Sequence, residues 1–306
     1  MLIDIRDAFF EELYKKIKTD KKIILITVDQ GAHTLIKLKK NYPKNYINIG
    51  ISEQNAFNVA TGLAKRGFKP YVYLIAPFTL RAIEQIKINL CSMKQKISII
   101  ASGPGFTYAS DGPTHYFNED YGILKNFPNM SFFCTSDSNS AKRAFRKSYK
   151  SKNPSFIRLE KGKFDNFGRY EDNSFNHISK GKDVLVVCNG FLSINTFNLL
   201  RYLGKDYKMG MLDITQFLPL EWSKIKKIIV KYKKIIFLDE SPLCSSINKD
   251  LHYLCLNELK KYQISYYLYN TKFQFWKIAG KREFLLKLNS LDPISLSKNI
   301  KKIIKK

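Results

Sequence analysis

The chain is short of the residues that mark several common classes of protein. It has 5 cysteines without CxxC spacing and only 4 histidines, and no metal-ligand spacing is present, so we predict no metal site in this chain. No apolar run is long enough to cross a bilayer, and the first residues lack the charged start and long apolar centre of a secretory signal. These absences predict a cytoplasmic protein with reduced core thiols and no membrane contact.

Acidic residues are also scarce, since 26 Asp and Glu stand against 52 Lys and Arg and give a net charge of +26. A charge of this size is typical of proteins that bind nucleic acids. The basic residues are spread over the whole chain, however, and no recognition-helix pattern or aromatic RNA-binding signature accompanies them. We therefore predict no nucleic-acid partner, and expect the charge to favour anionic ligands and an acidic partner chain. A basic binding protein or a catalytically silent structural subunit stays an alternative.

The 306 residues are enough for two domains, and apolar runs alternate with amphipathic stretches in the first part of the chain. Expected strands lie at 22–28, 71–75, 96–101, 126–134 and 155–158, and expected helices lie at 4–18, 55–64, 78–88 and 138–150. Strands that alternate with helices in this way predict an α/β domain with a doubly wound, mostly parallel sheet over residues 1–165.

A polar stretch of mixed charge and no periodicity follows, and we interpret residues 166–180 as a linker. A second alternation then predicts a smaller α/β domain over residues 181–306. Its expected strands are 183–188, 208–212, 234–238 and 266–269, and its expected helices are 192–203 and a final helix after 296.

Two acidic residues follow expected strands. Glu53 lies between a short apolar segment (47–51) and the helix expected from residue 55, and Asp29 follows the apolar run 22–28. Open α/β folds bind ligands at the carboxyl ends of their strands, which makes both carboxylates candidate site residues. Glu53 could equally complement the dipole of the following helix, and Asp29 could equally cap the next helix.

Glu53 belongs to a series of short motifs that run in order along the chain. They are Gly50-Ile-Ser-Glu-Gln-Asn55, Gly62-Leu-Ala64, Lys69-Pro70, Phe78-Thr-Leu-Arg81, Asp111-Gly-Pro-Thr-His115 and Pro128-Asn-Met130. Their order and spacing resemble the pyrimidine-binding half of the transketolase and deoxyxylulose-phosphate synthase family of thiamine diphosphate enzymes. The resemblance runs from about residue 20 to the end, and the second half resembles the carboxyl-terminal domain of transketolases and of 2-oxoacid dehydrogenase beta chains.

The resemblance implies thiamine diphosphate as the cofactor and assigns it three residues. Glu53 matches the family's glutamate, a carboxyl group in a dry pocket that hydrogen-bonds N1′ of the aminopyrimidine and favours its imino tautomer. Phe78 matches the aromatic residue that stacks on this ring, although core packing is the alternative. Ile75 stands where relatives often carry an aromatic residue, so we expect a more aliphatic pocket.

The resemblance also implies a set of substrate-binding residues. Arg81 follows Phe78 by one helical turn, on nearly the same face, and matches an arginine that grips an anionic substrate group in the synthases; a surface salt bridge is the alternative. His115 matches the histidine that assists proton transfers at the reacting carbon, and Asp111 would hold a substrate hydroxyl. Arg158 matches a basic residue near the distal phosphate, with a surface charge pair as the alternative. Asp29 completes the set as a minor candidate.

The chain departs from the family near His115. Tyr116 follows it where many relatives carry glutamine, and the segment 103–108 lacks the polar residues that ordinary transketolases place beside the sugar phosphate. The acceptor therefore stays open between a phosphorylated sugar and a nucleotide-linked sugar.

The sequence lacks the Gly-Asp-Gly start and downstream asparagine that hold the diphosphate through Mg²⁺ in this family. The resemblance thus implies one subunit of a split enzyme, with the Mg²⁺ ligands on an N-terminal-type transketolase subunit and two copies of each chain in a heterotetramer. The implied activity is transfer of a two-carbon ketol unit from a ketose to an aldehyde or keto acceptor. A deoxyxylulose-phosphate-synthase-like subunit is an alternative. So is a 2-oxoacid dehydrogenase beta-type subunit, although the motifs at 111–115 and 128–130 argue against it.

Overall fold

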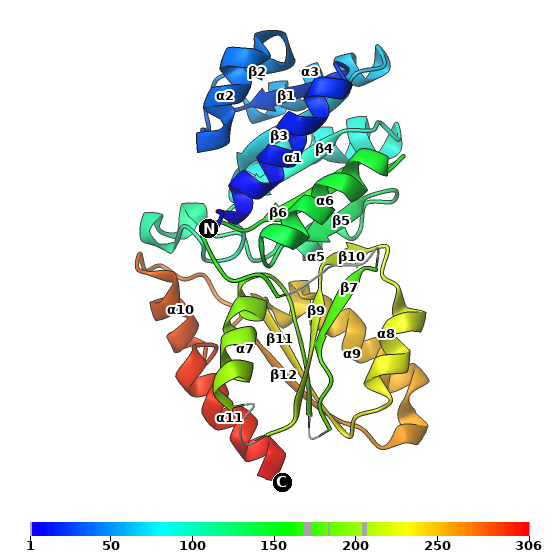
Figure 1. The fold of residues 1–306 in the computed structure, drawn as a ribbon, viewed down its shortest axis with the longest axis vertical. Helices are drawn as coiled ribbons and strands as arrows, with labels where there is room; N and C mark the ends of the chain where they lie inside the picture. The colour runs from blue at the N-terminus through cyan, green and yellow to red at the C-terminus, as the bar shows by residue number, and fades with distance from the viewer. Residues whose placement is uncertain (1, 168–172, 183, 204–206, 306) are drawn as a thin grey trace. The chain divides into compact units, whose positions relative to one another are not determined.

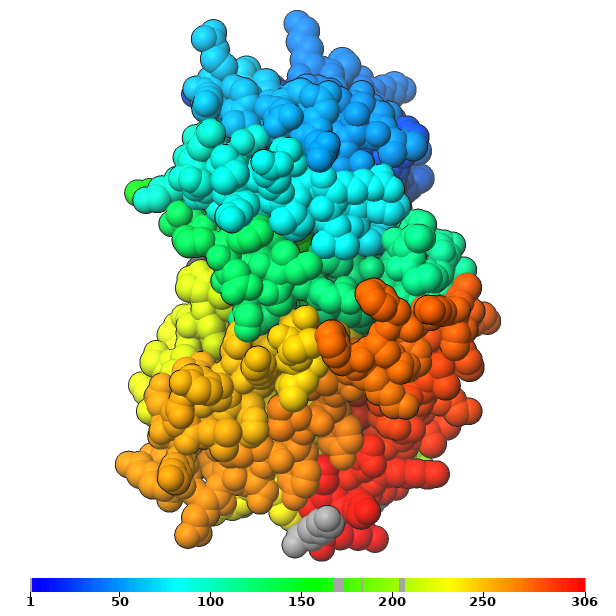
Figure 2. Space-filling view, turned by 180° about the vertical axis from the view of Figure 1, so that it is seen from behind, coloured from blue at the N-terminus to red at the C-terminus, as the bar shows by residue number. Residues whose placement is uncertain are grey.

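The computed structural model describes residues 2–167, 173–182, 184–203 and 207–305, which pack as two compact units. Figures 1 and 2 show the chain from opposite sides. The first unit contains the residues up to Pro104 together with Leu124–Asn166, and the second contains Gly105–Ile123 and the residues from Phe167 onward. By its packing, segment 105–123 therefore belongs with the second unit, although it lies within the range expected for the first domain.

The first unit is built on a parallel sheet. Adjacent strands in the order β5-β6-β4-β3-β1-β2 are all parallel. Strands β1, β4, β5 and β6 are buried along their whole length, as expected for a parallel sheet covered on both faces. The predicted doubly wound α/β fold is confirmed. The strands are β1 (Ile23–Thr27), β2 (Tyr46–Asn48), β3 (Lys69–Ile75), β4 (Ser98–Ser102), β5 (Ser131–Cys134) and β6 (Ser155–Leu159).

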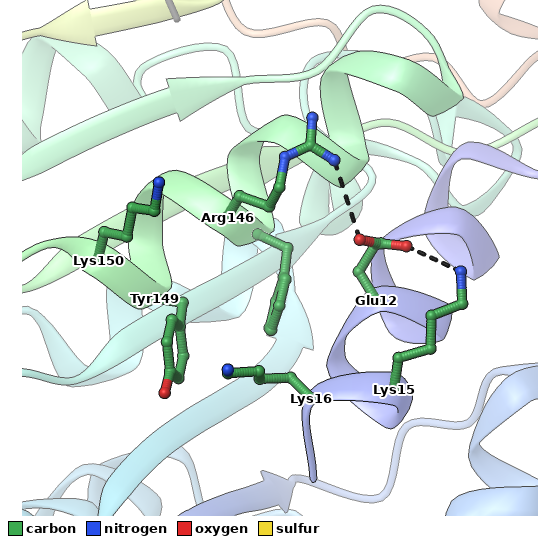
Figure 3. Close-up of a pocket in the computed structure, with 7 residues that line it drawn as sticks. Glu12, Lys15, Lys16, Arg146, Tyr149 and Lys150 are labelled. Carbon is green, nitrogen blue, oxygen red and sulfur yellow. Dashed lines mark hydrogen bonds and ion pairs between the residues drawn. The ribbon is translucent and has the colours of Figure 1, made fainter. Parts of the chain in front are cut away.

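Aromatic packing attaches two helices to this sheet. Phe10 of α1 meets Tyr73 of β3 edge-on at 4.8 Å between ring centroids, and Phe145 of α6 stacks on Tyr71 at 5.8 Å. Helices α1 and α6 lie side by side over the sheet (Figure 1). A surface groove of about 300 Å³ lies along them, lined by both helices (Figure 3). The α-helices of this unit, with α5 crossing its boundary, are α1 (Ile5–Thr19), α2 (His33–Asn41), α3 (Glu53–Lys65), α4 (Ile83–Gln85), α5 (Asp120–Leu124) and α6 (Ser138–Lys150).

Local sequence explains where α6 begins, and it does not explain the segment that follows β3. Asp137 caps α6 by accepting from the Ser140 amide at 2.7 Å, and the helix covers the predicted range 138–150. The single helix expected over 78–88 is instead a 3₁₀ helix at Ala76–Ala82, then α4, then a π-helical turn at Ile86–Ser92. A 3₁₀ helix has three residues per turn, so it places residues three apart directly above one another.

The second unit contains a mixed sheet in the order β12-β11-β8-β9-β7. Its neighbours are parallel except for β7, which runs antiparallel to β9. Strand β7 lies inside the expected linker 166–180, where the polar sequence gave no sign of it; residues 168–172 and Asp183 lie outside the described residues. The strands of this sheet are β7 (Phe175–Ser179), β8 (Val184–Cys188), β9 (Met209–Ile214), β11 (Lys234–Pro242) and β12 (Ser265–Thr271). The short strand β10 (Gln216–Leu218) lies outside this sheet.

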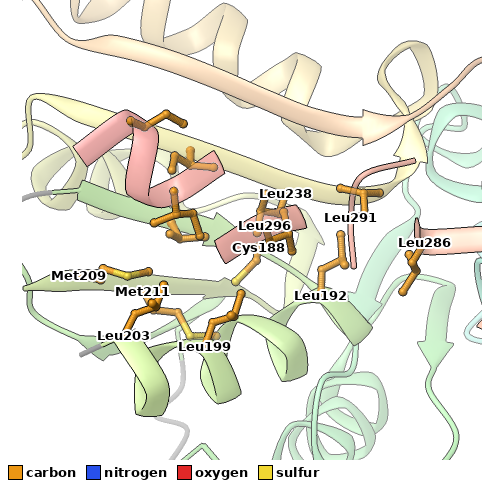
Figure 4. Packing of buried hydrophobic residues seen from close by; sticks show 14 of the residues in the cluster. Cys188, Leu192, Leu199, Leu203, Met209, Met211, Leu238, Leu286, Leu291 and Leu296 are labelled. Carbon is orange, nitrogen blue, oxygen red and sulfur yellow. The ribbon is translucent and has the colours of Figure 1, made fainter. Parts of the chain in front are cut away.

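The core of the second unit lies between this sheet and two of its helices. Leu192 and Leu199 of α7 and Leu296 of α11 pack with strand residues such as Met211 and Leu238 (Figure 4). The segment after β12, orange in Figure 2, lies at the surface of this unit. The helices are α7 (Gly190–Leu203), α8 (Trp222–Ile229), α9 (Ile247–Glu258), α10 (Arg282–Leu288) and α11 (Pro293–Lys305).

All the cysteines are free and all but Cys244 are buried, so the predicted core thiols are confirmed with one exception. Among the described residues, no helix combines the length and apolar character needed to cross a membrane.

Candidate active site

Glu53 is the first residue of α3 and lies just beyond the carboxyl end of β2. Gly50, with φ of +73°, makes the turn between the strand and the helix. The Glu53 side chain is only 5% exposed. A carboxylate at a helix start is favoured by the helix dipole, but that effect alone does not require burial. A buried acid needs a partner, and the structure supplies one.

The partner of Glu53 is Arg81. Arg81 Nη1 donates to Glu53 Oε1 at 2.8 Å, and its guanidinium carbon lies 4.2 Å from the centroid of the Phe78 ring. The arginine side chain remains 51% exposed. We call Glu53, Phe78 and Arg81 the Glu53 cluster. It joins a buried carboxylate to a cation that is half in solvent and stacked on an aromatic ring.

The 3₁₀ helix explains why Phe78 and Arg81 meet. The prediction that these two residues share a face is confirmed by their stacking. Ile75, which is half-buried, ends β3 directly before this helix. The salt bridge named as the alternative for Arg81 does exist, but its carboxylate is buried, so it is not a pair of two exposed charges.

Asp29 lies two residues beyond the end of β1, in the left-handed region with φ of +57°. Its amide donates to Asn48 Oδ1 at 3.1 Å, and Asn48 Nδ2 donates back to Asp29 Oδ1 at 3.3 Å. The helix-cap alternative for Asp29 is wrong, because the residue at the N-cap of α2 is Ala32. Asn48, which our sequence reading did not single out, joins the ends of two neighbouring parallel strands.

Arg158 is buried in β6, between β4 and β5. Its guanidinium carbon lies 5.8 Å from the centroid of the Phe132 ring on β5. The alternative of a surface charge pair is therefore wrong for this residue. Its expected role near a substrate phosphate stays a prediction.

The segment that carries Asp111 and His115 is a closed loop of the second unit. Gly105 and Phe117 exchange backbone hydrogen bonds of 3.0 and 3.2 Å at its neck. Gly105 has φ of +59°, and a Cβ there would lie 2.5 Å from Glu240 Oε2, so this position requires glycine. Two 3₁₀ turns, Ala109–Asp111 and Pro113–His115, form the far side of the loop.

Glu240 and Arg282 anchor this loop. Glu240 Oε1 accepts from the Phe106 amide at 3.2 Å and from Arg282 Nε at 2.9 Å, while Arg282 Nη2 donates to Oε2. Arg282 Nη1 also donates to Thr107 Oγ1 at 3.1 Å, and its guanidinium carbon lies 3.9 Å from the Phe191 ring centroid. We call Glu240, Arg282 and Phe191 the Glu240 cluster. This cluster was not predicted from the sequence. A signal was present, because Glu240 follows the apolar run 234–238 in the same way that Asp29 follows the run 22–28.

The loop presents its polar side chains differently. His115 is half-buried with Nδ1 2.9 Å from Thr114 Oγ1, whereas Asp111 is exposed. Tyr116 donates through its hydroxyl to the Ile278 carbonyl, and its ring meets Phe106 edge-on at 5.3 Å. The residue that replaces the family's glutamine therefore helps to hold the loop in place.

The predicted site residues divide between the two units. The structure brings Glu53, Phe78 and Arg81 into contact in the first unit, and it places Asp111 and His115 on one loop of the second. None of these five residues lines the groove beside α1 and α6. None of them lines a second groove, of about 470 Å³, beside α7 and α11. Within the described ranges, no group of three or more His, Cys, Asp and Glu side chains could hold a metal ion.

Comparisons with known proteins identify the family to which the chain is similar. A family model described as the transketolase pyrimidine-binding domain matches residues 2–165. An apulose-4-phosphate transketolase subunit from Phocaeicola vulgatus is 25% identical over 247 residues, which cover 78% of this chain and 79% of that protein. A 1-deoxy-D-xylulose-5-phosphate synthase from Halothermothrix orenii is 28% identical over 246 residues, which cover 77% of this chain and 38% of the enzyme. The chain spans less than half the length of the synthases that it matches.

Solved structures agree on the fold. A structure described as a split gene transketolase, inactive beta4 tetramer, superposes with a TM-score of 0.84 at 22% identity and covers 100% of this chain and 99% of that one. A transketolase from Pichia stipitis gives a TM-score of 0.77 at 17% identity, covering 99% of this chain and 46% of the enzyme. The predicted family and fold are both confirmed. Because the family model covers more than half of the residues, this chain belongs to the transketolase pyrimidine-binding domain family.

Proposed function

We propose that this chain is one subunit of a two-chain, thiamine diphosphate-dependent transferase of the transketolase type. The observation that carries the proposal is the Glu53 cluster: a carboxylate that is 5% exposed pairs with an arginine that stacks on an aromatic ring, in a chain of this family. Buried carboxylates are rare unless they are paired or functional. The reaction would move a two-carbon ketol unit from a ketose donor to an aldehyde or keto acceptor.

The residues of the Glu53 cluster fit an aminopyrimidine ring. Such a ring is flat and carries nitrogen atoms at its edge. Glu53 offers a carboxylate oxygen to that edge, and Phe78 offers a half-buried ring face on which it would stack. Ile75 would add apolar surface. The diphosphate and Mg²⁺ need other ligands, which we assign to the partner chain.

The side chains of this chain would then divide the work. When bound, thiamine diphosphate supplies the carbon nucleophile that breaks and re-forms the C–C bond. Glu53 would hold a proton at N1′ of the ring, and Phe78 would fix the ring's orientation. His115 would move protons at substrate hydroxyls, because an imidazole exchanges protons readily near neutral pH. Asp111 would orient one of those hydroxyls.

Cationic side chains support an anionic substrate. Arg81 is half exposed and presents a planar fork of donors that matches a phosphate group. Arg158 would meet a more distant phosphate, and Asp29 would bind at the substrate's polar end. A phosphorylated sugar or a nucleotide-linked sugar satisfies this pattern. The relative from P. vulgatus is itself named for a sugar phosphate.

A second chain is part of the proposal. Ile51 and Leu80 are exposed apolar side chains within two residues of Glu53 and Arg81 in the sequence, and a partner chain that covered them would remove apolar surface from water. The relative from P. vulgatus is named as one subunit of a transketolase, and one structural neighbour is named a split gene product. We propose an N-terminal-type transketolase subunit as the partner, with two copies of each chain.

The test uses the chain co-expressed and purified with an N-terminal-type transketolase subunit. Thiamine-dependent ketol transfer is measured for the wild type and for Glu53→Gln, and we expect a loss of at least about 100-fold, in the range attributed to a positioned proton donor. Glu12→Gln is the matched control, because Glu12 lies in the groove beside α1 and α6. Full turnover by the Glu53→Gln enzyme would contradict the proposal.

A deoxyxylulose-phosphate-synthase-like activity is the second candidate. Among the relatives described above, the synthase from H. orenii has the higher identity. The same purified pair separates the two candidates when it is offered a 2-oxoacid donor. Release of CO₂ coupled to the addition of the remaining fragment to an aldehyde supports the synthase, whereas ketose cleavage without CO₂ supports ketol transfer.

A further inference from the structure

Arg81 makes the two contacts through which the Glu53 cluster would hold the cofactor's ring. Its guanidinium is planar and carries N–H donors; an aminopyrimidine is also planar and carries an N–H at N1′ once that nitrogen is protonated. It donates to Glu53 Oε1 at 2.8 Å and faces the Phe78 ring at 4.2 Å. A separation of 4.2 Å is that of stacked groups in contact, so no second planar group fits between them.

We propose that Arg81 is an internal placeholder for the aminopyrimidine ring, so that the guanidinium and the ring bind Glu53 and Phe78 in competition. The inference rests on the proposed function of the Glu53 cluster. It adds a role for Arg81 that precedes substrate binding: the arginine must leave Glu53 before the ring can bind.

Burial explains why such a placeholder is stable. Glu53 is 5% exposed, and a buried carboxylate without a partner is strongly destabilising. Glu53 therefore needs a partner within the folded chain. Arg81 provides it from a neighbouring 3₁₀ helix.

Exposure explains why the placeholder can leave. Arg81 is 51% exposed and gives Glu53 one hydrogen bond, so water can take over much of its solvation when it moves away. The buried Arg282 gives Glu240 two hydrogen bonds and has no such route. The difference marks Arg81 as the arginine that can exchange.

The competition predicts an order of binding. A guanidinium that is paired with Glu53 is poorly available to the anionic group of a substrate, because the same donors and charge are already engaged. Once the ring replaces it, Arg81 is free to bind that anion. One residue would therefore couple cofactor loading to substrate binding.

The test measures ring affinity on the full-length chain by itself. The probe is 4-amino-2-methylpyrimidine, and its dissociation constant is measured by calorimetry or by NMR titration. We expect Arg81→Ala to bind the probe on the order of tenfold more tightly than the wild type, a change of about 1.4 kcal/mol. Adding Glu53→Gln to that variant should abolish the gain, and methylguanidinium should compete with the probe in Arg81→Ala.

Two controls distinguish a specific effect of Arg81 from a general effect of losing an arginine or of misfolding. Arg146→Ala removes another half-exposed arginine, paired with Glu12 at 3.9 Å, and should leave the affinity for the probe unchanged. If Arg81→Ala does not fold, Arg81→Gln keeps an amide donor for Glu53 and should show a smaller gain. Equal or weaker binding of the probe by the folded Arg81 variant would overturn the placeholder.

Failure of the inference and failure of the proposed function give different results. A gain in ring affinity without thiamine-dependent turnover by the two-chain complex overturns ketol transfer and leaves the placeholder intact. Turnover by the complex without a gain in the Arg81 variant overturns the placeholder alone.

Discussion

The two units each contain a glutamate, an arginine and a phenylalanine in contact, and the two clusters differ in how closed they are. In the Glu240 cluster the side chains of Arg282 and Glu240 are 8% and 9% exposed, and both carboxylate oxygens accept from the arginine. In the Glu53 cluster the arginine is 51% exposed and donates to one oxygen. The residue types are therefore the same, while solvent access and the number of hydrogen bonds are not.

This difference separates a structural pair from a candidate site. Arg282 also donates to Thr107, and Glu240 accepts from the Phe106 amide, so the closed cluster fixes the neck of the loop that carries His115. The open cluster leaves a cation that can exchange with a ligand of similar shape. Residue identity alone does not distinguish the two, because burial decides what it costs to break each pair.

The largest effect is expected when the closed pair is broken. Glu240→Gln leaves the buried Arg282 without its counter-charge, so the variant should lose roughly 3–5 kcal/mol of unfolding free energy. Urea unfolding of the wild type and the variant measures this loss. Adding Arg282→Met should recover part of it, because no buried charge is then left unpaired. A loss below about 1 kcal/mol would show that the two clusters do not differ in kind.

A third paired carboxylate, Asp20, tests whether burial determines how much such a pair contributes to the unfolding free energy. Lys69 Nζ and the Tyr149 hydroxyl donate to its Oδ2 at 2.5 and 2.8 Å, and the side chain is 14% exposed. Burial raises the pKa of Asp20, but the hydrogen bonds from Lys69, Tyr149 and the Lys22 amide outweigh it and lower the pKa from 3.8 to about 2. The ionised Asp20 carboxylate therefore stabilises the fold fully above pH 3.8, and this stabilisation is lost as the pH falls through about 2.

We accordingly expect Asp20→Asn to lose about 2 kcal/mol of unfolding free energy at neutral pH. The gap between wild type and variant should close as the solution is acidified through the pKa of the folded state. Denaturant unfolding at several acidic pH values measures this dependence. A gap that stays constant down to the lowest pH would contradict the assignment of the stabilisation to the Asp20 carboxylate.

The open pair should cost little to break. Glu53→Gln leaves Arg81 free to turn into water, so we expect a change in unfolding free energy below about 1 kcal/mol, despite the large loss of activity proposed above. The same urea experiment applies, with Glu240→Gln as the matched substitution. An equal loss from both substitutions would remove the distinction between the open and the closed cluster.

The smallest effect is expected at the surface. Arg146 is 53% exposed and lies 3.9 Å from a carboxylate oxygen of Glu12, at the limit of an ion pair (Figure 3). Arg146→Ala should change the unfolding free energy by no more than about 0.5 kcal/mol. Thermal unfolding at low and high salt measures it. A larger, salt-sensitive loss would mean that surface charge pairs matter more in this basic chain than elsewhere.

The sequence predicted regular elements well wherever a local pattern determines them. Helix α6 covers the predicted range because Asp137 caps it, and β1 and β4 follow their apolar runs closely. The prediction failed where the determinant is not local. Strand β7 forms at a polar sequence because β9 offers it an edge for pairing, and the segment after β3 is 3₁₀ and π-helical instead of one α-helix.

The sequence alone determined the family and the fold class, because motif order and apolar alternation are properties of the chain as written. It also supplied Glu53, Phe78 and Arg81 as candidates. Only the tertiary structure decided that the guanidinium of Arg81 contacts both of the others, that Arg158 is buried, and that Glu240 and Arg282 hold the neck of the His115 loop. The physical reason is that burial and pairing depend on residues far apart in the chain, which packing brings together and local patterns do not encode.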